Sequence, residues 1–129
     1  MLNDPLSNIL SNMLNAEKVG KAFCVTKPSS KIIKEVLKIM LEKEYIKGYQ
    51  EIDDGKGKMI KVELFGRINK CGVIKPRFSV NKGDYEKFEK RYLPAAGFGF
   101  IIVSTSKGLM MHDEAKKKGL GGRLISYVY

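Results

Sequence analysis

The side chains best suited to chemistry lie in one short stretch, where Ser104, Thr105 and Ser106 precede Lys107 and Gly108. This stretch puts short hydrogen-bonding groups, exposed backbone N–H groups and one positive charge within about one turn. Such a set suits a surface that binds phosphates and 2′-hydroxyls. An ordinary serine-rich turn has the same composition, so the stretch by itself leaves both interpretations open.

The glycine-rich segment Gly119–Gly122, which Arg123 follows, is the second candidate. In one interpretation Gly119 ends a helix in a left-handed conformation and the other glycines only turn the chain. In the other, the missing side chains let this backbone approach another backbone closely, either a neighbouring strand or an RNA sugar edge. Arg123 would then add a guanidinium that binds phosphate.

Catalysis has little support in the sequence. His112 is the single histidine of the chain, and Asp113 follows it on an expected helix start, where neighbouring side chains point apart and form no oriented triad. We therefore expect His112 to be a capping or surface residue. A small hydrolase that uses Ser104 or Ser106 with His112 remains as an alternative from another functional class.

Metals and cofactors are not expected. Cys24, Cys71 and His112 lack the paired spacings of a zinc site, and free cysteines are usually buried packing residues. Gly55–Lys58 lacks the longer loop and the Ser or Thr of a nucleotide-binding P-loop. With two distant cysteines and no leading apolar segment, we expect free thiols in a reducing cytosol, no membrane span and no small-molecule substrate.

The charge of the chain points to an anionic partner. Its 129 residues carry a formal net charge of +10 and have a pI near 9.6. Residues 1–55 are balanced, with eight lysines and eight acids, whereas residues 56–91 have eleven basic residues against four acids and residues 104–129 have five against two. Because all of the excess lies after Asp54, we expect a structural first half and a second half that binds a polyanion.

The elements that must position these residues can be read from the hydrophobic pattern. Helices are expected from Asn3-Asp4-Pro5 onward, from Ser29 or Ser30 to about Tyr45–Gly48 with Leu41 on the buried face, from Asp84 to Arg91, and over His112–Lys118. Strands are expected over Ala22–Thr26, Tyr49–Ile52, Met59–Phe65, Arg67–Ile74, Phe98–Val103 and Arg123–Tyr129.

Two small α+β domains follow from this order of elements. Residues 1–66 are expected to form an α-β-α-β-β unit with helices on one side of a small sheet, and residues 67–129 to form a β-rich domain with short helices, which is the half expected to bind a polyanion. In the second domain the buried strand Phe98–Val103 would present the Ser104–Lys107 turn. The strand Arg123–Tyr129 would place Leu124, Ser126 and Val128 on one face and Ile125, Tyr127 and Tyr129 on the other.

Ordered motifs at matching spacing make the chain resemble the eighth protein of the small ribosomal subunit, in its archaeal and eukaryotic branch. The motifs are Asp4-Pro5-Leu6, Ser29-Ser30-Lys31, Arg91-Tyr92-Leu93-Pro94, Phe98-Gly99-Phe100, Ser104-Thr105-Ser106-Lys107-Gly108, His112-Asp113-Glu114-Ala115, Gly121-Gly122 and Tyr127-Val128-Tyr129. The resemblance implies a cytoplasmic, non-enzymatic, primary rRNA-binding protein that docks on a distorted helix in the central domain of small-subunit rRNA, aids assembly and meets neighbouring ribosomal proteins.

The resemblance also implies which residues contact RNA. The core contacts are Ser104, Thr105, Ser106, Lys107, Gly121 and Gly122, to which we add Arg123 for its charge. The peripheral contacts are Asp4, Lys31 and Lys34, to which we add Lys58, Arg67 and Arg77 from the basic stretch between residues 56 and 91. The chain departs from the bacterial pattern at Arg123, Met111 and Tyr129, where an acid, a threonine and a tryptophan are common.

This set of contacts agrees with the shape of RNA. A-form RNA hides its base edges in a narrow major groove, so small hydroxyls and bare backbone suit its wide minor groove better than long arginines do. The basic stretch would add salt-sensitive attraction that does not depend on sequence. Two other binding functions stay open: a nonspecific nucleic-acid-binding protein, and a translational repressor whose messenger RNA imitates the ribosomal site.

Overall fold

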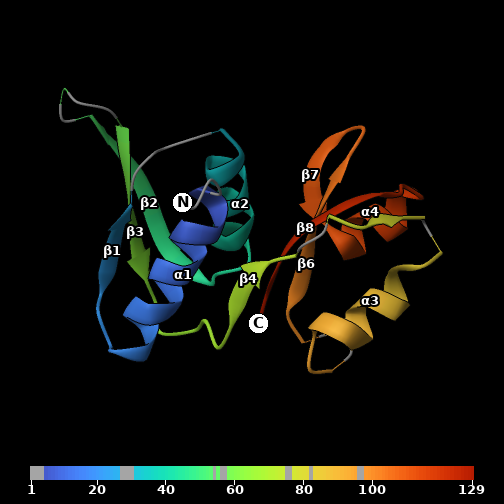
Figure 1. Cartoon of the computed structure of the whole chain (residues 1–129), viewed down its shortest axis with the longest axis horizontal. Helices are drawn as coiled ribbons and strands as arrows, with labels where there is room; N and C mark the ends of the chain where they lie inside the picture. Colours follow the sequence, from blue (N-terminus) through green and yellow to red (C-terminus); the bar gives the residue numbers. More distant parts are fainter. Residues whose placement is uncertain are drawn as a thin grey trace. The chain divides into compact units, whose positions relative to one another are not determined.

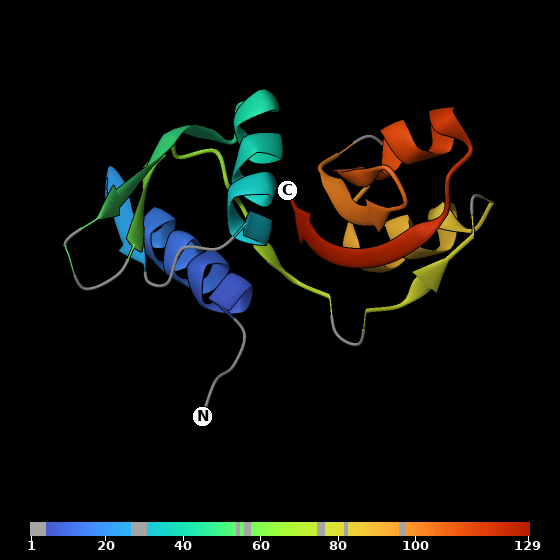
Figure 2. The ribbon, with the colours of Figure 1, turned by 90° about the horizontal axis from the view of Figure 1, so that it is seen from above.

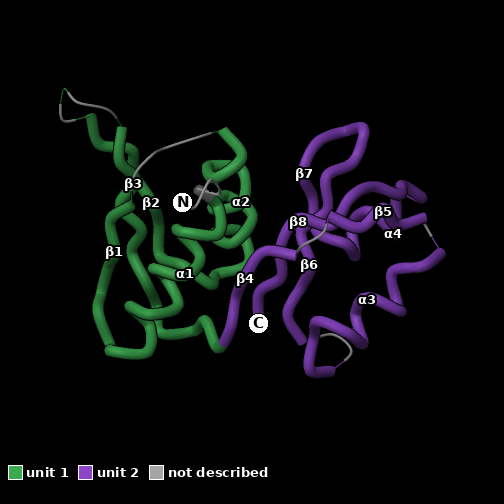
Figure 3. Tube along the Cα trace, in the orientation of Figure 1, with its two compact units in different colours: residues 1–69 green, residues 70–129 purple. Residues whose placement is uncertain are grey.

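The chain folds into two compact units, unit 1 (Met1–Asn69) and unit 2 (Lys70–Tyr129), coloured green and purple in Figure 3. The computed structural model describes residues 5–26, 31–53, 55, 58–74, 77–81, 83–95 and 98–129. Each unit combines helices with an antiparallel sheet, which confirms the predicted α+β class. The predicted domain boundary after residue 66 falls within unit 1.

Unit 1 packs two helices on a three-stranded sheet. Its elements are α1 (Pro5–Lys18), β1 (Phe23–Thr26), α2 (Lys31–Glu42), β2 (Ile46–Asp53) and β3 (Lys58–Leu64), and the strand order is β1-β3-β2. Figures 1 and 2 show both helices on the same side of the sheet. Because side chains alternate between the two faces of a strand, every second residue of β3 faces the helices. These residues, Ile60, Val62 and Leu64, are buried.

The end of α2 differs from the prediction. The helix ends at Glu42, and β2 begins at Ile46 instead of Tyr49. Glu44 adopts φ 62°, and the Tyr45 N–H donates to the carbonyl of Met40 at 2.9 Å, which closes the helix end. Leu41, which was expected to be buried, is 37% exposed in this last turn. A glutamate in the left-handed region gives no sequence signal, since that position usually holds glycine.

Unit 2 is a five-stranded antiparallel sheet with two short helices. Its elements are β4 (Cys71–Val73), β5 (Ser79–Val80), α3 (Tyr85–Tyr92), β6 (Phe100–Thr105), β7 (Gly108–Met111), α4 (His112–Lys118) and β8 (Gly122–Val128). The strand order is β4-β8-β6-β7, and β5 also pairs with β8. Tyr85 and Phe88 of α3 and Ala115 of α4 share a buried cluster with Ile101 and Val103 of β6.

Several strand predictions for unit 2 were wrong in detail. Of the expected strand Arg67–Ile74 only Cys71–Val73 forms β4, and Lys70 next to it exchanges two backbone hydrogen bonds with Tyr129. Phe98 is 50% exposed, and β6 begins only at Phe100, because the intervening Gly99 has φ 84°. A side chain could not replace Gly99, since its Cβ would lie 2.4 Å from the carbonyl oxygen of Val128.

A β-bulge changes the predicted faces of β8. Ile102 of β6 pairs with Ser126, but the next residue, Val103, pairs with Leu124, so Ile125 is an extra residue in β8. Leu124 therefore packs in the same cluster as Tyr127 and Tyr129 instead of on the opposite face. An extra residue resets a period-two pattern, and the sequence carries no marker for it.

Three further observations concern the start of α3, the cysteines and the length of the helices. Asp84 precedes α3 as expected, but its side chain makes no capping hydrogen bond. Cys24 and Cys71 are free thiols. In the part of the chain that the structure describes, no helix is long and apolar enough to cross a membrane.

Candidate nucleic-acid interface

The hydroxyl-rich stretch forms the tip of a β-hairpin. β6 continues through Ser104 and Thr105, and Thr105 pairs with Gly108, so Ser106 and Lys107 make a two-residue turn. The Thr105 hydroxyl donates to the Gly108 carbonyl at 2.9 Å and accepts the Lys107 N–H at 3.2 Å. Thr105 therefore holds the turn, which leaves the exposed Ser106 and Lys107 available for a ligand.

Strand pairing brings the two candidate segments together. β6 and β8 run antiparallel with Ser104 opposite Arg123, and β5 places Ser79 opposite Arg123 on the other side. The hydroxyl-rich tip and the end of the glycine segment thus lie side by side although they are far apart in the sequence. Figure 2 shows β8 running alongside the β6–β7 hairpin.

Each glycine interpretation holds for a different residue. Gly119 has φ 68° and ends α4, with its N–H donating to Lys116 O at 3.1 Å. Gly122 is the close approach to a neighbouring strand, since a Cβ there would lie 2.2 Å from Ser104 O and 2.9 Å from Val103 Cγ1. The absence of a side chain at Gly122 thus allows β8 to reach β6 beside the turn.

A residue of helix α3 is hydrogen-bonded to the glycine segment. The Tyr85 hydroxyl donates to the carbonyl of Leu120 at 2.9 Å, and the Tyr85 side chain is 1% exposed. Burial raises the pKa of Tyr85, so the hydroxyl stays a donor through neutral pH. Neither this contact nor that of Ser79 was predicted, because each joins segments that no local pattern connects.

His112 is buried, with 3% of its surface exposed, so the expectation of a capping or surface residue was wrong. Its Nδ1 accepts the Ile101 N–H at 3.0 Å, and its Nε2 lies 2.9 Å from Glu89 Oε1 and 3.5 Å from Asp113 Oδ1. Glu89 Oε1 also contacts Lys116 Nζ. The histidine therefore joins α3, β6 and α4 where α4 packs on the sheet.

This arrangement gives neither serine a catalytic base. Both ring nitrogens of His112 are engaged by groups of the protein. Ser104 lies three residues from Ile101 along β6, which corresponds to about 10 Å at the usual rise of a strand, and Ser106 lies further away. A nucleophile and its base must approach to hydrogen-bond distance. The described residues thus do not support the hydrolase alternative.

The same cluster also does not fit a metal ion. Ligand atoms of Glu89, His112 and Asp113 lie within 4.8 Å of one another. However, Nδ1 accepts a backbone N–H, so in the neutral ring the proton is assigned to Nε2, which then donates to Glu89 and has no lone pair for a metal. The ammonium of Lys116 beside Glu89 would further repel a cation.

The predicted peripheral residues are divided between the units. Lys31 is exposed at the start of α2 in unit 1, and Arg77 is exposed before β5 in unit 2. Asp4 lies outside the described residues.

Three of the peripheral cations already have acidic neighbours. Lys34 Nζ lies 3.0 Å from Glu51 Oε2, and Lys58 Nζ lies 3.7 Å from Glu51 Oε1. Arg67 Nη1 lies 3.3 Å from Glu44 Oε2. A nearby carboxylate lowers the attraction of these cations for phosphate.

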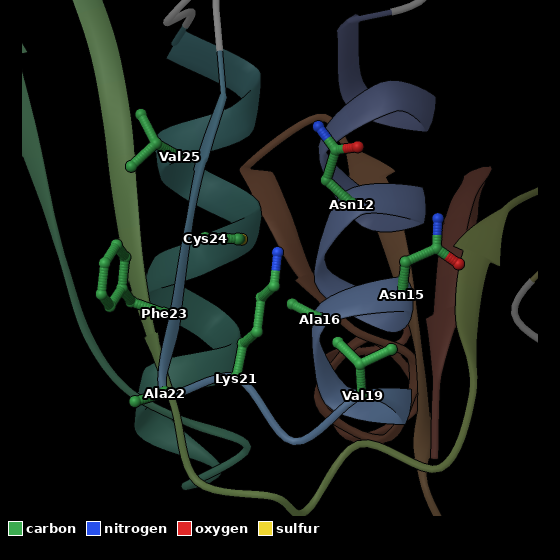
Figure 4. Close-up of a pocket in the computed structure, with 9 residues that line it drawn as sticks. All are labelled: Asn12, Asn15, Ala16, Val19, Lys21, Ala22, Phe23, Cys24 and Val25. Atoms are coloured by element: carbon green, nitrogen blue, oxygen red, sulfur yellow. The ribbon is translucent and has the colours of Figure 1, made fainter.

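A groove of about 680 Å³ lies between α1 and β1 (Figure 4). None of the predicted RNA-binding residues lines it; its walls are Asn12, Asn15, Ala16, Val19, Lys21, Ala22, Phe23, Cys24 and Val25. Burial, and then the nearby carboxylate of Glu17, raise the pKa of the Cys24 thiol to about 11. The groove therefore holds a thiol that is poorly ionised at neutral pH.

The excess charge lies mainly in unit 2. Unit 2 has twelve Lys and Arg against five acids, a balance of +7, whereas unit 1 has twelve against nine, a balance of +3. A basic α+β domain with an exposed hydroxyl-bearing turn has the features of a nucleic-acid-binding protein.

The comparison with protein families names the class more closely. The model of the family Ribosomal protein S8 matches residues 4–129, nearly the whole chain. The chain therefore belongs to the ribosomal protein S8 family, as the motifs predicted. It is a ribosomal RNA-binding protein of the small ribosomal subunit with a structural role. The archaeal and eukaryotic branch stays a prediction.

Proposed function

We propose that the chain is a primary rRNA-binding protein that docks unit 2 on an irregular helix in the central domain of small-subunit rRNA and stabilises that RNA for assembly. The observation that carries the proposal is the pairing of Ser104 with Arg123, which holds the hydroxyl-rich tip beside the glycine segment. RNA minor grooves display 2′-hydroxyls and phosphates, which hydroxyls, backbone groups and one guanidinium can bind together.

The residues of this surface have different roles in the proposal. Ser106 and Lys107 at the exposed tip bind the sugar edge and phosphate, and Ser104 adds a hydroxyl next to them. Thr105 keeps the tip rigid, because its own hydroxyl is bonded within the turn. The backbone of Gly121 and Gly122 faces the RNA, and Arg123 binds a phosphate.

The remaining contacts are the predicted peripheral residues of the two units. Exposure and positive charge support Lys31, Lys34, Lys58, Arg67 and Arg77, whereas Asp4 is included on the family resemblance alone. Cations that are paired with acids in the free protein exchange that partner for phosphate on binding, so each contributes less than an unpaired lysine would. Neighbouring ribosomal proteins of the small subunit are the other partners.

Replacing the Ser106 hydroxyl tests the proposal. The Ser106→Ala variant should bind an irregular helix of the central domain roughly fivefold more weakly, since one hydrogen bond contributes about 1 kcal/mol. The salt dependence should stay unchanged, whereas Lys107→Gln should reduce the salt slope by about one phosphate contact. Ser11→Ala, at an exposed serine of α1, is the matched control.

A regular duplex of the same length is the control RNA. Weaker binding of the wild-type protein to this duplex supports recognition of an irregular shape. Equal binding of the two RNAs would refute it and favour the nonspecific nucleic-acid-binding alternative.

A further inference from the structure

Two phenylalanines of unit 1 are largely exposed. Phe23 on β1 keeps 49% of its surface exposed and Phe65, directly after β3, keeps 44%. Phe65 follows the buried Leu64, so the period of two places it on the face of the sheet away from the helices. Figure 4 shows Phe23 and Val25 pointing away from α1, whereas Cys24 points toward it. Both rings therefore belong to the open face of this sheet.

The two rings are close neighbours on this face. Phe23 pairs with Glu63 across β1 and β3, and Phe65 lies two residues further along the chain. Diagonal neighbours in an antiparallel pair lie roughly 7–8 Å apart. The two residues are thus close enough along the sheet for one single strand of nucleic acid to reach both.

Basic side chains lie over both rings. Lys47 Nζ lies 5.7 Å and Arg67 Cζ 5.0 Å from the centre of the Phe65 ring, and Lys61 Nζ lies 4.6 Å from the centre of the Phe23 ring. Lys47 occupies the β-bulge between Ile46 and Gly48. Bulges redirect side chains, which accounts for the position of Lys47 beside Phe65.

Arg67 is held in place but keeps free donors. Its Nη1 lies 3.4 Å from Glu44 O and 3.3 Å from Glu44 Oε2. Within the described residues these bonds use only one of its three nitrogens, so the others can bind a phosphate. The acid Glu63 of β3 lies opposite Phe23.

The combination of exposed rings and cations favours nucleic acid over an apolar protein partner. An apolar partner would have to remove Lys47 and Lys61 from water without supplying a counter-charge of its own. An unpaired nucleotide offers a base that stacks on a phenylalanine ring and a phosphate that neutralises the neighbouring cation.

We propose that Phe65, with Lys47 and Arg67, forms a stacking site for an unpaired RNA base, and that Phe23 with Lys61 accepts a second base of the same strand. The site lies on unit 1 and is separate from the hairpin tip of unit 2. It rests on the RNA-binding class of the chain and does not depend on the proposed docking of unit 2.

Two oligonucleotides separate stacking from charge. The probes are a ten-nucleotide oligoadenylate and an abasic strand of the same length, which has the same phosphates but no bases. With the full chain, Phe65→Leu should weaken oligoadenylate binding roughly tenfold and leave abasic binding unchanged, since stacking on one aromatic side chain has about this effect. Phe65→Tyr should restore binding. Lys47→Gln and Arg67→Gln should weaken binding to both strands.

Phe98→Leu is the matched control, because Phe98 is 50% exposed but has no cation over its ring among the described residues. It should leave oligoadenylate binding unchanged. Equal oligoadenylate binding by Phe65→Leu and wild type would overturn the proposal. So would loss of a ribosomal protein, with RNA binding intact, from subunits reconstituted with Phe65→Leu, which would assign the face to a protein.

The proposed RNA contact of the hairpin tip in unit 2 can fail independently of the stacking site. Ser106→Ala is measured on the irregular helix, whereas Phe65→Leu is measured on single strands. A normal result for Ser106→Ala with a weakened Phe65→Leu would refute the hairpin tip and support the stacking site.

Discussion

Gly122 is the position where one methyl group should disturb both the stability of unit 2 and its binding surface. In Gly122→Ala the new Cβ would lie 2.2 Å from Ser104 O and 2.9 Å from Val103 Cγ1. Ordinary contacts are longer, so β8 must move away from β6 by about 1 Å. A shift of this size breaks hydrogen bonds between the strands and separates Ser104 from Arg123.

The free energy of unfolding should fall by about 3 kcal/mol. Overpacking of a tight site costs about 1–3 kcal/mol, and each backbone hydrogen bond that is lost adds about 1 kcal/mol. Hydrogen exchange of β6 and β8 peptides, read by mass spectrometry during a urea titration, reports on unit 2 separately from unit 1. Binding of the irregular RNA helix should weaken together with this loss of protection.

Gly83→Ala provides the control in the same unit. Gly83 has no described atom within 4 Å of an added Cβ and does not have a positive φ. The variant should therefore match the wild type in stability. If Gly122→Ala unfolds at the same urea concentration as Gly83→Ala, the inference that β8 needs a bare backbone beside Ser104 is wrong.

Three further predictions concern Tyr85, His112 and Cys24. Tyr85→Phe removes the hydrogen bond to Leu120 O, so unit 2 should lose about 1 kcal/mol in urea titrations. Because burial raises the pKa of Tyr85, the wild type should also lose stability as the pH rises above about 10, and the variant should lose less. His112→Phe leaves the Ile101 N–H unpaired and should cost about 2 kcal/mol, measured in the same way. Cys24 should react slowly with iodoacetamide at pH 8, and its rate should rise about tenfold per pH unit toward pH 11, followed by mass spectrometry.

Each of these three predictions could be contradicted by a specific result. The direction of the pH effect follows from the raised pKa of Tyr85 in the folded protein. Its contribution to the free energy of unfolding is complete below the pKa of tyrosine in the unfolded chain, and it is lost as the pH rises through the pKa in the folded protein. If the Tyr85→Phe variant loses as much stability at high pH as the wild type does, this prediction is wrong. His112→Asn can still accept the Ile101 N–H, so it should be more stable than His112→Phe. Rapid alkylation of native Cys24 at pH 8 would contradict its raised pKa.

Much of the fold was predictable because local patterns encode local structure. Apolar residues at helical spacing located α1 and α2, and the acids before the lysines in His112–Lys118 located α4. Gly119 was recognised as a helix end because few residues other than glycine adopt φ 68° without strain. The β-branched run located β6, although Phe98 before it turned out to be exposed.

The details that failed depend on contacts between distant segments. The left-handed Glu44, the bulge at Ile125 and the buried His112 have ordinary local sequences. His112 is buried only because Glu89 of α3 and the Ile101 N–H of β6 supply its hydrogen bonds. Such partners can be named only when the packing of the elements is known.

The sequence by itself determined the chemistry of the protein: its charge, its hydroxyl-bearing segment, its glycines and its membership of the ribosomal protein S8 family. Only the tertiary structure decided that Thr105 is used within the turn and that Ser104 lies opposite Arg123. It also exposed Phe65 between Lys47 and Arg67. The reason is physical: composition and period act over a few residues, whereas strand register and burial depend on the energy of packing the whole unit.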